Sequence, residues 1–171
     1  MREADMFRRL FAVTTAALLL LMTGATSALG AAGGTDRPFR ATGSGQVTFD
    51  PNNPRGCVSY LGPVTEVITG TGQATHLGRF TMSASHCPTP TQSTQGLMTL
   101  TAANGDEIYG SYTNDLAFVD GTVRVTGWLT ITGGTGRFAH ATGSLWQDHT
   151  VFLGPAPPFV VQLTFTGRLS Y

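Results

Sequence analysis

The strongest constraint on the fold is an alternation of apolar and polar residues with a period of two, in short segments that glycine or proline interrupts. Between residues 122 and 132, the odd positions hold valine, leucine, isoleucine and one glycine, whereas threonine, arginine and tryptophan hold the even positions. Successive side chains of a strand point to opposite faces, so this segment predicts a strand with one buried face. Beyond residue 28 no ten-residue stretch has apolar residues at helical spacing, and we therefore expect an all-β fold.

A second segment predicts a β-hairpin. Asn104-Gly105 readily adopts the two positive φ values of a type I′ turn, and it separates strands expected at 97–102 and 107–112. The proline-rich stretch 155–158 predicts a loop, because proline donates no hydrogen bond to a sheet. Three further strands are expected at 39–49, 142–153 and 159–171.

The last predicted strand ends at the C-terminus and needs a partner. We expect that partner to be the strand at 39–49, because pairing the first strand with the last removes both exposed edges. About eight strands fit the length of the chain, which predicts a single antiparallel eight-stranded barrel, closed or nearly closed. A two-layer β-sandwich is the alternative.

The N-terminal residues have the order of a secretory signal peptide. Arginines precede an apolar run at 10–22, and small residues follow it. We predict a signal peptide at 1–28, with cleavage possible as late as residue 32, a flexible mature N-terminus at 29–38 and the barrel domain at 39–171. An uncleaved N-terminal anchor is the alternative. The expected location is extracellular, with no stable membrane span after cleavage.

The two cysteines, Cys57 and Cys87, both lie in the exported part of the chain. An oxidising compartment favours a disulfide between them. The alternatives are two reduced structural thiols, or Cys87 as a nucleophile beside His86. Neighbouring side chains on a strand point to opposite faces, which argues against the last interpretation.

The charge of the chain argues against a nucleic-acid partner. Every basic residue is arginine, and in the mature region acidic and basic side chains nearly cancel. No basic stripe is present to bind phosphates.

Known catalytic, phosphate-binding and metal-binding motifs are absent from the sequence. The glycine turns have no G-x-x-x-x-G-K-[ST] or G-x-G-x-x-G pattern, and there is no G-x-S-x-G elbow. No two histidines have the close spacing of a zinc site. We therefore predict no metal and no cofactor, and we assign no catalytic residue. The four histidines are His76, His86, His140 and His149.

Arg79 and Arg137 are candidates for ligand binding, because each lies in a Gly-Arg-Phe triplet. A guanidinium pointing into a pocket would hold a carboxylate or a hydroxyl group. In the alternative, which we favour, the arginines lie on the wet face while Phe80 and Phe138 anchor the turns in the core.

Two segments resemble a known group of proteins. Gly-Gln-Ala-Thr-His-Leu-Gly-Arg-Phe-Thr at 72–81 and Thr-Gly-Gly-Thr-Gly-Arg-Phe-Ala-His-Ala-Thr-Gly at 132–143 resemble signatures of small secreted bacterial β-barrel proteins. The second also resembles the G-G-T-G-x-F-x-x-A-x-G stretch of plant dirigent proteins, which share the allene oxide cyclase barrel. The resemblance implies an eight-stranded antiparallel barrel whose apolar interior binds apolar or phenolic ligands. It carries no catalytic residue over to this sequence.

These observations leave three functions open. The leading hypothesis is a non-catalytic secreted barrel that binds a small apolar or amphipathic ligand, or that serves a cell-envelope interaction. The second is an allene oxide cyclase-like or dirigent-like enzyme acting on a ligand inside the barrel. The third is a structural or protein-interaction module, for which Trp128 and Trp146 would be the natural anchors if they point outward.

Overall fold

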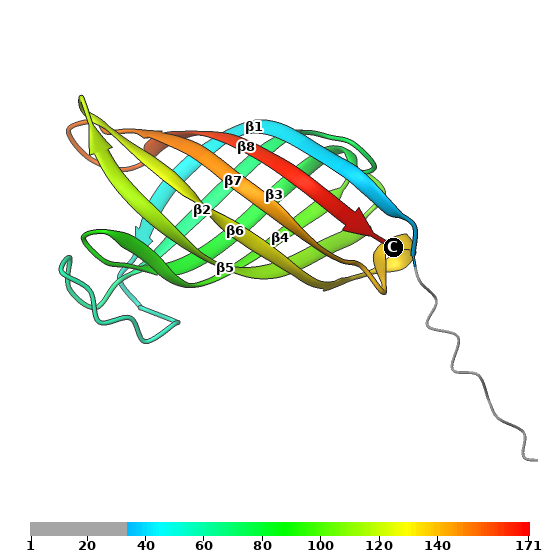
Figure 1. Ribbon diagram of the computed structural model, residues 1–171. Coiled ribbons are helices and arrows are strands. Elements are labelled where there is room, and N and C mark those ends of the chain that lie inside the picture. The colour runs from blue at the N-terminus through cyan, green and yellow to red at the C-terminus, as the bar shows by residue number, and fades with distance from the viewer. Residues whose placement is uncertain (1–33) are drawn as a thin grey trace, which may run out of the picture. The chain divides into compact units, whose positions relative to one another are not determined.

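The computed structural model describes residues 34–171, which form a closed barrel of eight antiparallel strands joined in chain order (Figure 1). The prediction of a closed barrel is confirmed, and the sandwich alternative is wrong. The predicted signal peptide at 1–28 lies outside the described residues. The strands are β1 (Asp36–Asp50), β2 (Thr65–Ala74), β3 (Gly78–Pro88), β4 (Gln92–Ala102), β5 (Glu107–Val119), β6 (Thr122–Gly134), β7 (Thr142–Phe152) and β8 (Phe159–Ser170), and a 3₁₀ turn, η1 (Gly136–Phe138), joins β6 to β7.

The first and last strands close the barrel, as the sequence predicts. β1 pairs with β8 from Asp36, opposite Ser170, to Val47, opposite Phe159. The strand begins three residues before the boundary expected at 39, because residues 36–38 already pair with β8. An ion pair between Arg168 and Asp36 joins the two strands at this point.

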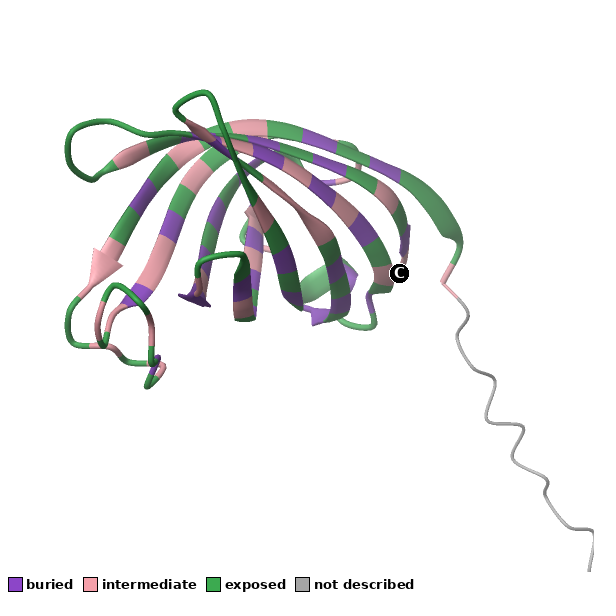
Figure 2. Ribbon diagram, turned by 60° about the vertical axis from the view of Figure 1, so that its left-hand side comes forward, coloured by how far each residue is buried: buried purple, intermediate pink, exposed green. Residues whose placement is uncertain are grey.

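The period-two alternation determines which side chains fill the barrel. Buried and exposed residues alternate along each strand, and the buried ones form one core inside the barrel (Figure 2). The inward face predicted for β6 is confirmed, because Val123, Leu129 and Ile131 are buried. On β8, Val161 and Leu163 are buried as well. Other inward residues with almost no exposed surface are Phe39, Leu100, Ile108, Leu145, Phe165 and Leu169.

The two ends of the barrel differ. At one end η1 folds inward and buries Phe138 completely, with its ring 4.8 Å from that of Tyr171. Leu77, in the β2–β3 turn, is buried at the same end. We call this the closed end, and it lies to the right in Figure 1. The other end, which we call the open end, carries the β1–β2 loop at 51–64 and the β7–β8 loop at 153–158.

A disulfide fastens the long β1–β2 loop at the open end. Cys57 in the loop is bonded to Cys87 near the end of β3, with 5.2 Å between their Cα atoms, so the predicted disulfide is confirmed. Asn53 organises the same loop: its Oδ1 accepts from the backbone N–H of Cys57 at 2.7 Å and from the Thr65 hydroxyl at 3.1 Å. The loop is therefore held over the end of the barrel at two points.

Within the described residues, no helix is long and apolar enough to cross a membrane.

Candidate functional site

The barrel interior holds a cavity of about 320 Å³ near the open end. Tyr60 and Phe118 line its rim and are each more than half exposed, so the cavity reaches solvent. Apolar side chains form most of its lining. On the β8 and β1 wall these are Val47, Phe49, Phe159, Val161 and Leu163, and deeper in the barrel they are Met82 and Met98.

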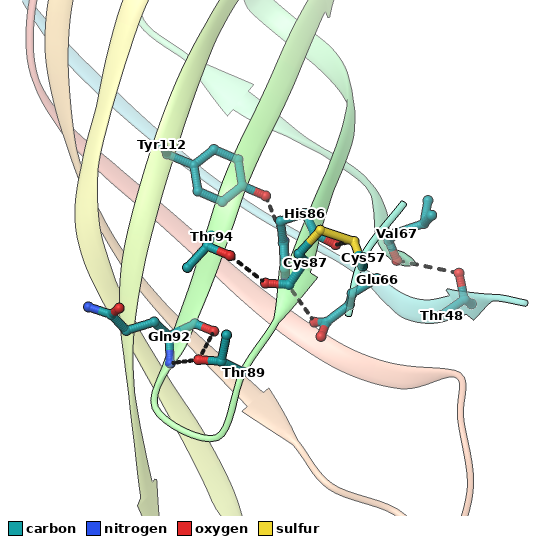
Figure 3. A network of polar contacts seen from close by, with 10 residues as sticks. All are labelled: Thr48, Cys57, Glu66, Val67, His86, Cys87, Thr89, Gln92, Thr94 and Tyr112. Carbon is teal, nitrogen blue, oxygen red and sulfur yellow. Dashed lines mark hydrogen bonds and ion pairs between the residues drawn. A yellow bond between two sulfur atoms is a disulfide. The ribbon is translucent and has the colours of Figure 1, made fainter. Parts of the chain in front are cut away.

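A first group of polar side chains lines the cavity from strands β2, β3 and β5 (Figure 3). Nδ1 of His86 lies 2.8 Å from the hydroxyl oxygen of Tyr112, within hydrogen-bonding distance. Nε2 of the same imidazole lies 3.4 Å from Oε1 of Glu66, its register partner on β2. This second contact lacks hydrogen-bond geometry, so the buried Nε2 has no hydrogen-bond partner among residues 34–171. It is a polar atom that a bound molecule could satisfy.

A glycine allows Tyr112 to reach His86 across an intervening strand. Tyr112 on β5 pairs with Gly96 on β4, and β4 separates β5 from β3. A Cβ atom at position 96 would lie 2.4 Å from a ring carbon of Tyr112, so any side chain there would force the ring to move. The absence of a side chain at Gly96 therefore leaves the space that the tyrosine ring occupies.

A second polar group lines the cavity from β5 and β7. The backbone N–H of Thr164 donates to Nδ1 of His149 at 3.1 Å. Nε2 of His149 lies 3.2 Å from Oε1 of Gln147, and Nε2 of Gln147 donates to Oδ1 of Asn114 at 2.9 Å. The side chains of His149, Gln147 and Asn114 are each at most 3 % exposed. Together they form a buried hydrogen-bonded chain that runs from β8 to β5.

A glycine also lies between Gln147 and Asn114, the last two residues of this chain. Gly127 on β6 pairs with Asn114 on one side and with Gln147 on the other. A Cβ atom at position 127 would lie 2.3 Å from Oδ1 of Asn114. Tyr112 and Asn114 thus occupy consecutive inward positions of β5. Each of them reaches its partner across a glycine on the neighbouring strand.

Burial sets the protonation states of Tyr112 and His149, one residue from each polar group. Desolvation raises the pKa of the Tyr112 phenol, with a smaller contribution from the charge of Glu66, so the phenol stays neutral. Desolvation lowers the pKa of His149 to about 4, although the neighbouring Asp148 opposes that shift. The imidazole of His149 is therefore neutral near pH 7, which agrees with its Nδ1 accepting a backbone hydrogen bond.

Arg79 and Arg137 lie near the turns of the closed end, whereas the cavity is near the open end. Both are exposed, whereas Phe80 and Phe138 are buried, which is the arrangement favoured from the sequence. Arg137 donates to the carbonyl of His76 at 2.7 Å and joins two turns there. Neither arginine lines the cavity among the described residues.

The histidines do not converge on a metal site. Among residues 34–171, no group of three or more histidine, cysteine, aspartate or glutamate side chains is close enough to hold a metal ion. His86 and His149 line the cavity, while His76 and His140 lie at the closed end. The nucleophile interpretation of Cys87 is wrong, because its sulfur is bonded to Cys57.

Sequence reasoning missed most of the polar residues of the cavity. Of these residues only His86 and His149 were named from the sequence, and no role was given to Tyr112, Asn114, Gln147 or Glu66. A signal was present, because Asn114 continues the inward face of Tyr112 and Gln147 stands between inward Leu145 and inward Val151. A polar residue at an inward position is rarely neutral for structure and often marks a site.

The fold and the site together define a closed eight-stranded antiparallel β-barrel with a partly polar interior cavity open at one end. No protein-family model, curated protein or solved structure matches this chain.

Proposed function

We propose that this protein binds a small, mainly apolar molecule in the barrel interior without transforming it. The observation that carries the proposal is the cavity of about 320 Å³, which opens to solvent and combines an apolar lining with a few converging polar groups. Ligand pockets of this size typically have this composition, since apolar contact supplies affinity and a few polar groups fix orientation.

The construction of the open end supports the same function. Met82 and Met98 lie deep in the cavity, and methionine adapts its shape to different apolar surfaces. The disulfide between Cys57 and Cys87 fastens the loop that carries Tyr60 and Leu61 to the rim. A rim fixed before binding reduces the entropy lost when a ligand is held.

Titration with the neutral fluorescent probe phenylnaphthylamine tests the proposal. Leu116 points into the cavity, whereas its neighbour Ala117 is exposed on the outer face. We expect Leu116→Trp to fill part of the cavity and to weaken probe binding at least tenfold, a loss of about 1.4 kcal/mol. The matched variant Ala117→Trp should bind like the natural protein. Equal binding by both variants, or no binding by the natural protein, would contradict the proposal.

A second candidate function is catalysis inside the cavity, and the contact between His86 and Tyr112 favours it. A phenol and an imidazole with a free Nε2 beside Glu66 are groups that can move protons on a bound molecule. This candidate predicts that the ligand extracted from the protein, purified from its own secretion route, separates by chromatography into two isomers of equal mass, as an isomerisation requires. It also predicts that His86→Gln retains binding and leaves one species.

We further propose that the chain functions outside the cytoplasm and belongs with the allene oxide cyclase-like and dirigent-like barrels. The disulfide supports export, because such bonds persist in oxidising compartments. The closed eight-stranded barrel and the buried Phe138 of the glycine-rich segment support the relationship. Detection of the mature protein, cleaved between residues 28 and 32, in the culture medium of its host would test the first part.

A further inference from the structure

The hydrogen-bonded chain from Thr164 to Asn114 has only one possible direction. A backbone N–H can only donate, so Nδ1 of His149 must be the accepting nitrogen at 3.1 Å. A neutral imidazole then carries its proton on Nε2 and donates it to Oε1 of Gln147 at 3.2 Å. The assignment follows from the Thr164 backbone and needs no assumption about the side-chain amides.

The same logic continues to the end of the chain. Because Oε1 of Gln147 accepts from the imidazole, the amide nitrogen of Gln147 faces Asn114 and donates to its Oδ1 at 2.9 Å. The amide of Asn114 therefore cannot turn over without losing this bond. Its Nδ2 group, which has two N–H donors, makes no hydrogen bond to the described residues, and Asn114 lines the cavity. The backbone N–H of Thr164 on β8 thus determines the orientation of the Asn114 amide on β5.

The charge around the cavity restricts what this donor can receive. Glu66 is the one acidic side chain in the lining, and no arginine of the described chain lines the cavity. Arg55 approaches Tyr112 from the groove on the outer side of the wall, where its guanidinium bonds to the carbonyl of Gln95 and to Ser85. An anionic ligand would lose its hydration without gaining a positive partner inside the barrel.

We propose that the cavity selects uncharged molecules that carry a carbonyl oxygen, which accepts a hydrogen bond from Nδ2 of Asn114. This assignment rests on the proposed binding function and adds the chemical class of the ligand. A ketone or ester fits it, because its oxygen accepts without donating and its body remains apolar. A free carboxylate does not, because Glu66 shares the cavity. The donor, Asn114, lies on β5, and the apolar wall is formed by β8 and β1. The carbonyl oxygen of the ligand therefore points toward β5.

Three probes of similar shape test the class: acetylnaphthalene, ethylnaphthalene and naphthoate, each measured by displacement of phenylnaphthylamine at pH 7. We expect the ketone to bind about threefold to tenfold more tightly than the hydrocarbon, which is the range for one neutral hydrogen bond. Naphthoate should bind more weakly than both. If the hydrocarbon binds as tightly as the ketone, or if naphthoate binds best, the carbonyl assignment is wrong while the cavity still binds ligands. If none of the four compounds binds, the proposed function itself fails.

Asn114→Asp isolates the donor, because the carboxylate still accepts from Gln147 but has no N–H to offer. We expect this variant to bind ketone and hydrocarbon with equal affinity. Asn104→Asp makes the same charge change in the exposed β4–β5 turn and should keep the preference for the ketone. A preference that survives in Asn114→Asp would overturn the proposal.

A measurement on the natural protein covers the case in which Asn114→Asp does not fold. In a ¹⁵N spectrum, acetylnaphthalene should shift the side-chain amide signals of Asn114, and ethylnaphthalene should shift them much less. The side-chain signals of Asn104 serve as the internal reference, because that residue lies in an exposed turn. Equal shifts of the Asn114 amide by both compounds would contradict a hydrogen bond to the carbonyl.

Discussion

Gln147 donates a hydrogen bond to Asn114 at 2.9 Å although a complete strand lies between the two residues. The bond exists because the intervening register partner is Gly127. Side chains normally meet across a sheet only on adjacent strands, where Cβ atoms are about 5 Å apart. A glycine at the middle position extends that reach to the next strand and gives the cavity wall its polar chain.

A methyl group at position 127 should break this chain. In Gly127→Ala the new Cβ would lie 2.3 Å from Oδ1 of Asn114 and 2.6 Å from the carbonyl of Thr113, so backbone must shift. We expect the free energy of unfolding to fall by about 2 kcal/mol, the usual cost of overpacking with a lost buried hydrogen bond. Urea unfolding measures it. The control is Gly154→Ala, whose nearest contact would be 3.8 Å away, and an equal loss there would contradict the explanation.

Stability should decrease as the pH falls from about 6.5 toward about 4. His149 has a pKa of about 4 in the folded protein and an ordinary value of 6.5, so the unfolded chain takes up the proton first. The contribution is fully present above pH 6.5 and amounts to about 3 kcal/mol, which is lost on acidification and is gone near pH 4. Urea unfolding at a series of pH values measures this dependence.

The variant His149→Gln should have a much flatter dependence over this pH range, because it lacks the imidazole. His140→Gln, at an exposed position, should keep the dependence of the natural protein. A natural protein whose stability does not change over the range would show that His149 is not held neutral by burial.

Removal of the disulfide should affect both stability and binding. The double variant Cys57→Ser, Cys87→Ser frees the 51–64 loop, and the chain-entropy model gives a loss of about 3 to 4 kcal/mol for a loop of this size. Because that loop carries Tyr60 and Leu61 to the cavity rim, phenylnaphthylamine should also bind more weakly. Thermal unfolding and probe titration measure the two effects. Unchanged probe affinity in the folded double variant would show that the rim does not depend on the disulfide.

The two tryptophans should behave as one optical unit. Trp128 and Trp146 are register partners on the outer face, with ring centroids 5.2 Å apart and planes at 66°. Indoles this close couple electronically, so the near-ultraviolet circular dichroism should contain a paired signal that either Trp128→Phe or Trp146→Phe abolishes. A double-mutant cycle should give a coupling of about 0.5 to 1.5 kcal/mol. Additive spectra and additive stabilities would argue that the rings do not contact each other in solution.

Substitution of the two arginines in the Gly-Arg-Phe triplets should lower the stability of the protein to different degrees and leave ligand binding unchanged. Arg137→Gln removes the bond to the carbonyl of His76 and the 3.6 Å contact with Asp106, so we expect a loss of about 0.5 to 1 kcal/mol at this exposed site. Arg79→Gln should change the free energy of unfolding by less than about 0.5 kcal/mol. Probe titration should give unchanged affinities for both. A marked loss of affinity in either variant would instead support the hypothesis that these arginines bind ligand.

The sequence by itself indicated six of the eight strands, the inward face of β6 and the closure of the barrel, whereas β2 and β3 were not located. These properties are local or nearly so: alternation assigns each side chain to a face, Asn104-Gly105 sets a turn, and an unpaired last strand requires the first as its partner. The inward positions of β6 and the contrast between exposed Arg137 and buried Phe138 follow from the same pattern.

Only the tertiary structure decided which inward residues face one another, and therefore where the cavity lies. Whether Tyr112 meets His86 depends on the register of β3, β4 and β5, including the irregular pairing on both sides of β4 that brings Gly96 opposite Tyr112. Register over distant strands is set by the whole closed sheet and not by any one segment. The alternation shows that Asn114 points inward, but its partner across Gly127 emerges only when the barrel closes.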